Sequence, residues 1–427
     1  MKVALVSSYD ESGGAGRAAG RLHQGLRGQG VDSDLIVQQR GGDDAAVFAP
    51  ESRVVRLVDW ISPSVDFFPL RLYKKGPGLF WLKWMPGFGI KRVLSRSPDV
   101  VNLHSFQPGF IRLESVRKFR LPLVWTMHDK WCLTGGCHFS GSCTRYEDSC
   151  GKCPQLSSDH SFDLSRWSWN RKRKVYPKCN LTFVAPSKWL ADCVRRSSLL
   201  GDASVEVIPN GIDLERFRPV NAALARDAFQ IPDNRPVVLF GAESATTDPR
   251  KGFQYVRPML EYFRSRFPDM ELTILVFGAS RPTEGMDLPF GTHFLGRLRA
   301  DVSLRMAYSA ADVFLCPSEE DNLPLTVIEA MACGTPTVAF RLGGLPDLVD
   351  HTRTGYLANP FDVEDLAEGV KQVIDSAGSS RECREKAVRE FDLELQACRY
   401  KALFESIISR NAQDRQPDSA GWAARLG

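Results

Sequence analysis

Residues 2–37 read KVALVSSYDESGGAGRAAGRLHQGLRGQGVDSDLIV, and this stretch decides the expected fold. Residues 2–8 form a short apolar run that predicts a strand. A glycine loop follows at residues 13–17, then a helical pattern over 18–27 and a second strand at 31–37. The order strand, glycine loop, helix, strand is typical of the opening of a parallel α/β sheet.

The same alternation continues along the chain in two series. The first series predicts further buried strands at residues 100–103, 123–127 and 182–185. The second predicts strands at residues 237–240, 272–277, 292–295, 313–316 and 337–339, with helices that include 304–310, 325–332 and 363–376. Two successive βα series predict two doubly wound, Rossmann-like α/β domains. We expect these domains to face each other across a cleft.

Length and composition agree with two large globular domains. The chain has 427 residues, of which 43% are hydrophobic and 25% are charged, and its net charge is +4. These values exclude a mainly disordered, collagen-like or small disulfide-stapled protein. The balanced charge gives no support to a nucleic-acid partner, so we expect none.

The chain shows no targeting or membrane-spanning signal. No window approaches 18 uncharged apolar residues, and the short apolar run at the N-terminus is followed at once by acidic residues. We therefore expect a cytoplasmic protein. Structural disulfides are rare in that compartment, so the eleven cysteines need another explanation.

The glycine loop is a candidate phosphate site. Glycines at 13, 14 and 16 let the backbone approach a phosphate, and the following helix offers free N–H groups. A plain tight turn remains an alternative, because the loop is not the full dinucleotide-binding fingerprint. No acidic residue follows Val37 at the place of a ribose contact, which argues against an NAD site.

A second candidate site is the segment SEEDNLPLTVIEAMACG at residues 318–334. Asp321 and Glu329 are eight residues apart, one at a loop and helix start and the other two turns along that helix. Amides at the helix N-terminus can hold a diphosphate, while the carboxylates accept hydrogen bonds from sugar hydroxyls. Taken alone, Asp321 could be only a helix cap.

This segment resembles the acid-x7-Glu donor site of the family 4 retaining glycosyltransferases, which have the two-domain GT-B fold. Other motifs continue the resemblance in the correct order over most of the chain. They are Ala185-Pro186-Ser187, Pro209-Asn210-Gly211-Ile212-Asp213, Phe294-Leu295-Gly296, the run 310–318, Gly343-Gly344-Leu345-Pro346-Asp347-Leu348 and Thr354-Gly355-Tyr356-Leu357.

The patterns predict the following domain bounds. Residues 1–208 form the acceptor domain, with a cysteine-rich insert at 130–156, and residues 209–390 form the nucleotide-sugar donor domain. Residues 391–411 form a helix that crosses back to the N-terminal domain, and 412–427 form a flexible tail.

The resemblance implies roles for individual residues. Glu329 would bind the ribose, Asp321 the donor sugar, and Lys251 the leaving diphosphate. His128, at the end of a strand, would face the transferred sugar. The expected catalytic residues are thus His128, Asp321 and Lys251. The expected donor-binding residues are Gly14, Gly16, Arg250, Lys251, Asp321, Asn322, Leu323, Pro324, Leu325, Thr326 and Glu329.

The sequence departs from the family pattern at two places. The first acid of the donor motif is Asp321 instead of glutamate. The strand at 237–240 continues with Gly241 and Ala242, without the arginine that usually follows. Either Arg250 or Arg297 could then supply the second cation for the phosphates.

The implied function is a retaining glycosyltransferase that needs no metal for transfer. It would move a hexose from a UDP- or GDP-linked donor to a glycan or lipid-diphosphate-linked acceptor, in surface or exopolysaccharide assembly of the colanic-acid type. The alternative is a catalytically inactive binding or scaffold protein of the same fold. A sugar-nucleotide epimerase or dehydrogenase is disfavoured, since no Tyr-x-x-x-Lys pair is present.

The cysteine cluster is a candidate metal site. Cys137, Cys143, Cys150 and Cys153 end in a C-x-x-C pair, and this spacing in a reducing compartment favours four-thiolate zinc over disulfides. An iron–sulfur cluster uses the same ligands and stays a weaker alternative. Free thiols in a loop are the third interpretation.

Residues 67–98 contain no acid, and their basic residues alternate with aromatic residues. The basic residues are Arg71, Lys74, Lys75, Lys83, Lys91, Arg92 and Arg96, and a second basic run is Arg171-Lys172-Arg173-Lys174. This composition suits an anionic membrane surface or a lipid-diphosphate acceptor. We therefore expect peripheral association with the inner face of the plasma membrane. The alternative is a solvated face with the tryptophans packed inward.

Overall fold

The chain folds into two compact units. The computed structural model describes residues 1–74, 78–231, 235–243, 245–278, 288–376 and 379–415. Unit 1 comprises residues 1–185 and 191–208 together with the chain from Gln396 onward, and unit 2 comprises 186–190 and 209–395.

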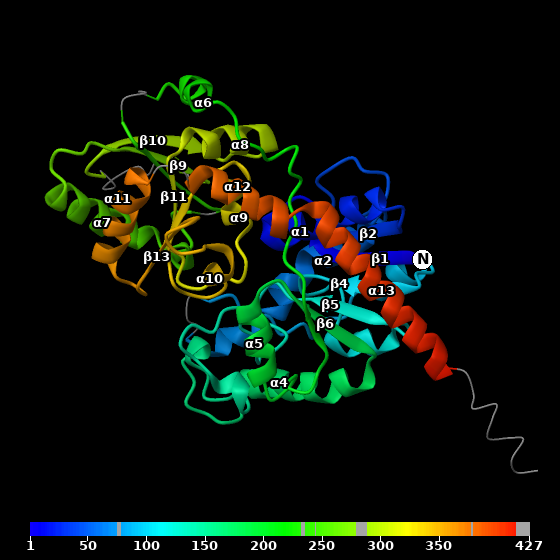
Figure 1. The fold of residues 1–427 in the computed structure, drawn as a ribbon. Coiled ribbons are helices and arrows are strands. Elements are labelled where there is room, and N and C mark those ends of the chain that lie inside the picture. Colours follow the sequence, from blue (N-terminus) through cyan, green and yellow to red (C-terminus); the bar gives the residue numbers. More distant parts are fainter. Residues whose placement is uncertain (75–77, 232–234, 244, 279–287, 377–378, 416–427) are drawn as a thin grey trace, which may run out of the picture. The chain divides into compact units, whose positions relative to one another are not determined.

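Unit 1 is built on a seven-stranded parallel sheet in the order β3-β2-β1-β4-β5-β6-β7 (Figure 1). The strands are β1 (Lys2–Tyr9), β2 (Asp32–Gln39), β3 (Val47–Phe48), β4 (Val100–Leu103), β5 (Leu123–Thr126), β6 (Leu181–Ala185) and β7 (Val205–Val207). The helices are α1 (Gly13–Gly28), α2 (Arg53–Asp66), α3 (Gly89–Leu94), α4 (Leu164–Val175), α5 (Lys188–Arg196) and α13 (Leu393–Arg415). The strand order reverses between β1 and β4, which is the point where ligands bind in such sheets.

Short 3-10 helices occur in the connections of unit 1. They are η1 (Phe68–Leu72), η2 (Leu113–Lys118), η3 (Arg145–Glu147), η4 (Pro154–Leu156) and η5 (Tyr176–Lys178).

Unit 2 has a six-stranded parallel sheet in the order β10-β9-β8-β11-β12-β13. The strands are β8 (Val237–Gly241), β9 (Thr273–Phe277), β10 (Gly291–Gly296), β11 (Val313–Cys316), β12 (Thr337–Phe340) and β13 (Gly355–Ala358). The helices are α6 (Ala222–Ala228), η6 (Pro249–Lys251), α7 (Phe253–Arg266), α8 (Asp301–Ala310), α9 (Leu325–Ala332), α10 (Leu345–Leu348), α11 (Val363–Asp375) and α12 (Ser379–Glu390). Here the order reverses between β8 and β11.

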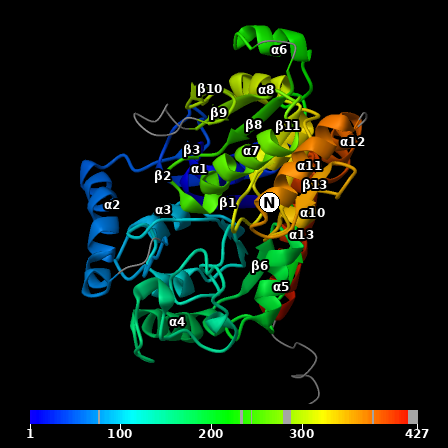
Figure 2. The same cartoon turned by 90° about the vertical axis from the view of Figure 1, so that its left-hand side faces the viewer.

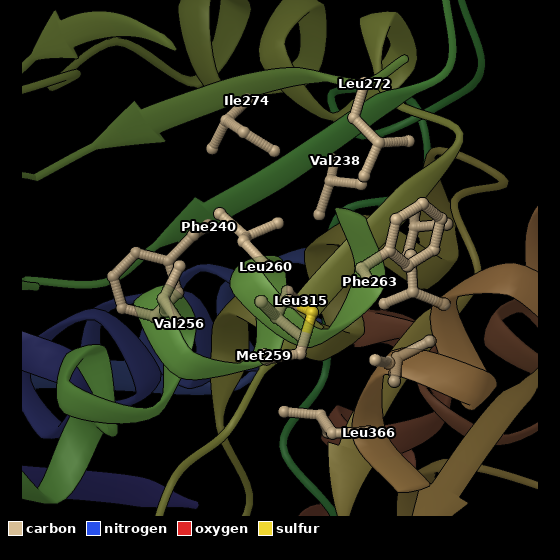
Figure 3. Close-up of a cluster of buried hydrophobic side chains, with 14 of the residues drawn as sticks. Val238, Phe240, Val256, Met259, Leu260, Phe263, Leu272, Ile274, Leu315 and Leu366 are labelled. Atoms are coloured by element: carbon tan, nitrogen blue, oxygen red, sulfur yellow. The ribbon is translucent and has the colours of Figure 1, made fainter. Parts of the chain in front are cut away.

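The core of unit 2 lies between its sheet and the helices α7 and α11 (Figure 3). Val256, Met259, Leu260 and Phe263 recur on one face of α7 at helical spacing, and all are buried. Apolar residues of the strands meet them, among them Val238, Phe240, Ile274 and Leu315. Helix α9 packs against α8 and α12, whereas α11 packs against α7. The sheet therefore has helices on both faces, as its apolar strands require.

The core of unit 1 needs the C-terminal helix α13 (Figure 1), most of which is hidden in the view of Figure 2. Tyr400, Phe404 and Ile407 of α13 are buried in the same cluster as Leu22 of α1 and Val124 of β5. These three residues recur at helical spacing, so one face of α13 covers the sheet. The helix is thus an integral part of this core.

The sequence predicted both sheets, most of their strands and five of the helices. The two parallel sheets and all eight strands named beyond residue 37 are present, whereas the short edge strands β3 and β7 and strand β13 were not predicted. The glycine loop prediction was wrong, because residues 13–17 form the first turn of α1. Glycine permits α1 to lie close to the end of β1. A Cβ atom on Gly16 would lie 3.1 Å from the Tyr9 carbonyl oxygen, and a Cβ atom on Gly20 would lie only 2.4 Å from the Asp10 carbonyl oxygen.

The C-terminal segment also differs from the expectation. Helix α13 continues to Arg415, so residues 412–415 are helical and do not belong to a tail. The remainder of the expected tail lies outside the described residues. None of the helices in the described part of the chain combines the length and the apolar character that a membrane-spanning segment requires.

We predict that Phe404→Ala lowers the free energy of unfolding by about 3–5 kcal/mol, the usual loss for deleting a buried phenyl ring. Phe404 has no exposed surface. Denaturant unfolding of the full chain measures the change, and Cys398→Ala, at an exposed position of the same helix, is the control. Equal stability of the two variants would contradict the role assigned to α13.

Candidate functional site

A small pocket lies where the sheet order of unit 2 reverses, at the carboxyl ends of β8 and β11. It is lined by Phe240, Gly241, Ala242, Lys251, Leu315, Cys316, Ser318, Asp321 and Thr326. Three of the predicted donor-binding residues, Lys251, Asp321 and Thr326, thus meet at one place. The other predicted donor-binding residues of unit 2 are close to these three in sequence but do not line the pocket. They are Arg250, Asn322, Leu323, Pro324, Leu325 and Glu329.

The pocket contains an ion pair. Lys251 Nζ lies 2.7 Å from Asp321 Oδ2, and both side chains are mostly buried. Burial on its own would lower the pKa of Lys251, but the Asp321 carboxylate outweighs burial and the net pKa is raised. Lys251 is therefore a cation at neutral pH, held beside the pocket by a carboxylate that can also accept a hydrogen bond from a ligand.

The loop that carries Asp321 is held from two sides. On one side Glu319 N–H donates to the Arg250 carbonyl at 2.9 Å. On the other, Gly344 N–H donates to the Asp321 carbonyl at 2.9 Å. A Cβ on Gly344 would lie 1.6 Å from the Asn322 carbonyl oxygen, so only glycine allows this approach. The motif at 343–348 thus supports the loop, a role that sequence reasoning did not assign to it.

Helix α9 begins directly after this loop. Pro324 occupies its N-cap, and no side chain caps the first turn. Within the described residues, the N–H groups of Leu325 and Thr326 have no acceptor. Because Thr326 also lines the pocket, the positive end of α9 faces the same space as Lys251.

Glu329 and Asn322 lie behind the pocket. Glu329 is 1% exposed and its Oε2 accepts a hydrogen bond from the Tyr308 hydroxyl at 2.9 Å. Asn322 Oδ1 accepts one from the Ser187 hydroxyl at 2.5 Å. Both side chains therefore hold the loop and α9 in place in the structure described here.

Neither arginine considered for the second phosphate contact lines the pocket. Arg250 forms an ion pair with Asp248, and Arg297 forms an exposed ion pair with Glu243 at 3.2 Å. Lys251 is thus the only basic residue that lines this pocket in the described part of unit 2.

In unit 1, His128 follows β5 and belongs to a chain of hydrogen-bonded side chains. Its Nε2 lies 3.0 Å from His104 Nδ1, and His104 Nε2 lies 2.9 Å from Asn102 Oδ1. Asn102 Nδ2 donates to the Val124 carbonyl and to the Thr126 hydroxyl, which lies 2.9 Å from the Tyr400 hydroxyl. Sequence reasoning found His128 but none of its supports.

This chain fixes the proton positions. The Val124 carbonyl can only accept, so the amide NH2 of Asn102 must face it and Oδ1 must face His104. His104 Nε2 therefore carries a proton and Nδ1 accepts from His128 Nε2–H. Burial lowers the pKa of His104 well below 6.5 and that of His128 to about 4, so both rings are neutral. His128 Nδ1 is left as an acceptor, without a partner among the described residues.

The glycines at the start of α1 differ from each other. A Cβ on Gly14 would meet no atom within 4 Å, so its backbone is open to a ligand. Gly16 is buried against Tyr9, and packing alone explains the absence of a side chain there.

The four cysteines of the predicted metal site come together in unit 1. Cys137, Cys143, Cys150 and Cys153 all line one cavity. They are free thiols, and among the described residues no three His, Cys, Asp or Glu side chains are arranged to hold an ion.

Only part of the predicted basic surface is exposed, namely Arg71, Lys74, Lys91, Arg173 and Lys174. Lys83 and Lys172 are buried, with their Nζ atoms 3.9 Å and 3.6 Å from the centre of the Trp131 ring. Arg92 donates to the carbonyls of Val37 and Phe48, and Arg171 pairs with Glu114. These cations are used inside unit 1, where cation–π contacts and carbonyl oxygens replace water. Lys75 lies outside the described residues.

Two family profiles match the chain. The one described as Glycosyltransferase Family 4 matches residues 12–216, and the one described as Glycosyl transferases group 1 matches residues 235–376. The putative colanic acid biosynthesis glycosyl transferase WcaC of Escherichia coli K12 is 26% identical over 348 residues, which are 77% of this chain and 80% of that protein.

Solved structures show the same fold. Sucrose-phosphate synthase from Thermosynechococcus elongatus matches with a TM-score of 0.67 and 18% identity over 96% of this chain and 99% of that one. Anabaena HepE, in complex with UDP and glucose, matches with a TM-score of 0.61 and 16% identity over 95% of this chain and all of that one. The predicted GT-B fold is confirmed.

We predict that His128 Nδ1 is unprotonated from pH 5 to pH 8, because the pKa of His128 lies at about 4. Asn102→Leu removes the acceptor that orders the chain, so both rings should become mixtures of tautomers. Long-range ¹H–¹⁵N NMR of ¹⁵N-histidine-labelled protein measures this. Thr126→Val keeps the bond from Asn102 to Val124 and is the control. Titration of His128 near pH 6.5 would contradict the assignment.

Proposed function

We propose that this chain, which belongs to the glycosyltransferases that combine a family 4 domain with a group 1 domain, transfers a hexose from a nucleoside-diphosphate sugar to a glycan acceptor with retention of configuration. The observation that carries the proposal is the Lys251–Asp321 ion pair in a pocket at the switch point of unit 2, beside the N-terminus of α9. A catalytically inactive scaffold protein would not require this ion pair in the pocket.

The chemistry of the leaving group explains these residues. When the bond from the anomeric carbon to the diphosphate breaks, negative charge develops on the phosphate oxygens. Lys251 and the open amides of Leu325 and Thr326 stabilise that charge without a metal ion. Asp321 keeps Lys251 in place and offers its second carboxylate oxygen to a hydroxyl of the donor.

The other donor contacts follow from the remaining side chains. Glu329 accepts hydrogen bonds from the ribose hydroxyls, which requires its carboxylate to turn partly away from Tyr308. The open backbone at Gly14 contacts the distal phosphate. The His128 Nδ1 acceptor takes a hydrogen bond from a hydroxyl of the transferred sugar, and its neutral state suits that task.

Retention needs no enzymic nucleophile in this proposal. The acceptor hydroxyl attacks the anomeric carbon from the face that the diphosphate leaves. Its proton passes to a phosphate oxygen of the departing nucleoside diphosphate, so one C–O bond breaks and one forms. The similarity to a colanic acid glycosyl transferase and to a structure with bound UDP and glucose supports an exopolysaccharide acceptor and a UDP-linked donor.

We predict that the protein releases nucleoside diphosphate from one UDP- or GDP-hexose and transfers the sugar to a glycan acceptor. Lys251→Met should lower kcat by about 100-fold or more, since it removes the cation from the leaving group. Glu319→Gln is the control, because Glu319 lies in the same loop but contacts Tyr255 and Gln254 outside the pocket. Product analysis by NMR gives the anomeric configuration. Undiminished transfer by Lys251→Met would contradict the mechanism.

A lipid-linked acceptor at an anionic membrane is supported by helix α2 and the following η1. The buried residues of α2 are Asp59, Ser62 and Asp66, so the polar face of this helix is turned inward. The Asp66 carboxylate accepts hydrogen bonds from the backbone N–H groups of residues 82–85, and Asp59 pairs with Arg92. These contacts fix the helix in this orientation.

The apolar residues of the same segment are turned outward. We call them the α2 face: Val54, Leu57, Trp60, Ile61, Phe68 and Leu72. Trp60 is 72% exposed and Leu72 is 86% exposed. The exposed cations Arg53, Arg56, Arg71 and Lys74 lie in the same segment. Exposed apolar residues of this number mark an interaction site, and the cations suit anionic lipid headgroups at about 1 kcal/mol each.

We predict that the protein binds vesicles that contain anionic lipid and that the double substitution Trp60→Ser and Leu72→Ser lowers binding at least tenfold. Vesicle flotation at low and at high salt measures the partition. Phe162→Ser removes an equally exposed aromatic ring outside the α2 face and should bind like the unmodified chain. If the double variant binds vesicles as well as the unmodified chain, the α2 face is not the membrane-binding surface.

A further inference from the structure

The segment between β5 and α4 is long, buried and irregular. Residues 127–163 contain only the two 3-10 turns η3 and η4, yet many of their side chains are buried. A loop of this length without regular structure is unusual inside a compact unit. Turns and scattered backbone hydrogen bonds hold it, such as that from the Lys152 N–H to the His160 carbonyl at 2.9 Å.

Four cysteines of this segment converge on one cavity. Cys137, Cys143, Cys150 and Cys153 line it together, and its volume is about 20 Å³. No three of these side chains are already arranged to hold an ion among the described residues, so binding requires their sulfur atoms to turn toward the space that they share.

One backbone N–H group already points at a sulfur atom of the cluster, because Gly135 N–H donates to Cys150 Sγ at 3.1 Å. A hydrogen bond of this kind stabilises a thiolate, which is the form that binds a metal. Gly151 and Lys152 have positive φ values of 139° and 46°, so the chain turns tightly between Cys150 and Cys153.

We propose that Cys137, Cys143, Cys150 and Cys153 bind one structural Zn²⁺ in tetrahedral geometry. On binding, the four thiols release their protons to solvent and the sulfur atoms turn into the cavity to reach about 2.3 Å from the ion. The resulting site carries two negative charges, and Arg145, which also lines the cavity, offers a positive charge.

The zinc site fixes the residues next to His128. His138 follows Cys137 directly, and its Nδ1 lies 2.8 Å from Asp129 Oδ2. The Lys130 N–H donates to the His138 carbonyl at 2.9 Å, so the cysteine segment folds back on residues 129–130. Zinc at Cys137 thereby anchors the loop that begins with His128. This consequence for transfer depends on the function proposed above, but the metal site does not.

The test is the metal content of the full-length protein, purified without chelators. Elemental analysis and native mass spectrometry should find one zinc per chain. Cys143→Ser and Cys150→Ser should each lower the zinc content severalfold. Cys132→Ala is the matched control, because Cys132 lies in the same segment but does not line the cavity, and this variant should keep its zinc.

Cobalt substitution of the unmodified chain covers the case in which the cysteine variants fail to fold. One Co²⁺ per chain should give the visible absorption of a tetrahedral four-thiolate site. A folded chain without metal, a disulfide among these cysteines, or iron with acid-labile sulfide would each overturn the proposal. Zinc content is read without any sugar substrate, so a protein that holds zinc but transfers no sugar would contradict only the proposed function.

Discussion

All strands in both sheets are parallel, and this constraint decides where chemistry can occur. Parallel strands bring their carboxyl ends to the same edge, and the loops that leave this edge diverge where the strand order reverses. In unit 2 that point lies between β8 and β11, and the pocket with Lys251 and Asp321 is formed there. In unit 1 it lies between β1 and β4, whose following segments begin α1 and carry His104.

Glycine and charge hold the unit 2 site together in different ways. The backbone of the loop with Asp321 approaches two other backbone segments so closely that only glycine fits there. These glycines are Gly252, beside Pro317, and Gly344, beside Asn322. The contacts are steric and define the loop path. The Lys251–Asp321 pair then sets the charge of the pocket. A rigid loop with a preorganised cation requires little rearrangement when charge develops on a ligand.

The sequence predicted the strands with central positions well, because these are short apolar runs that belong to buried parallel sheets. It did not predict the edge strands β3 and β7, which have two and three residues and little hydrophobic pattern. Spacing predicted Asp321 at the start of a helix and Glu329 two turns along it, and the structure has Asp321 just before α9 and Glu329 within α9. The family resemblance implied that Lys251 and Asp321 both bind the donor, but their ion pair across seventy residues was not predicted.

Other features could not be predicted from local sequence at all. The support of His128 by His104 and Asn102 depends on the register of β4 beside β5, which no single stretch encodes. The exposure of Lys83 in the basic aromatic segment was predicted wrongly, because a lysine in the sequence looks the same whether it is solvated or surrounded by aromatic rings. Helix α2 was overlooked as a surface because its apolar residues suggest a core-facing helix.

The return of α13 to unit 1 has a consequence for biosynthesis. Unit 2 is inserted between two parts of unit 1, so a ribosome finishes residues 209–395 before it supplies the last helix of the first unit. Until Tyr400 and Phe404 emerge, the sheet of unit 1 lacks part of its apolar cover, and the Thr126 hydroxyl lacks its Tyr400 partner. The nascent chain therefore completes its second unit before the hydrogen-bonded support of His128 is assembled.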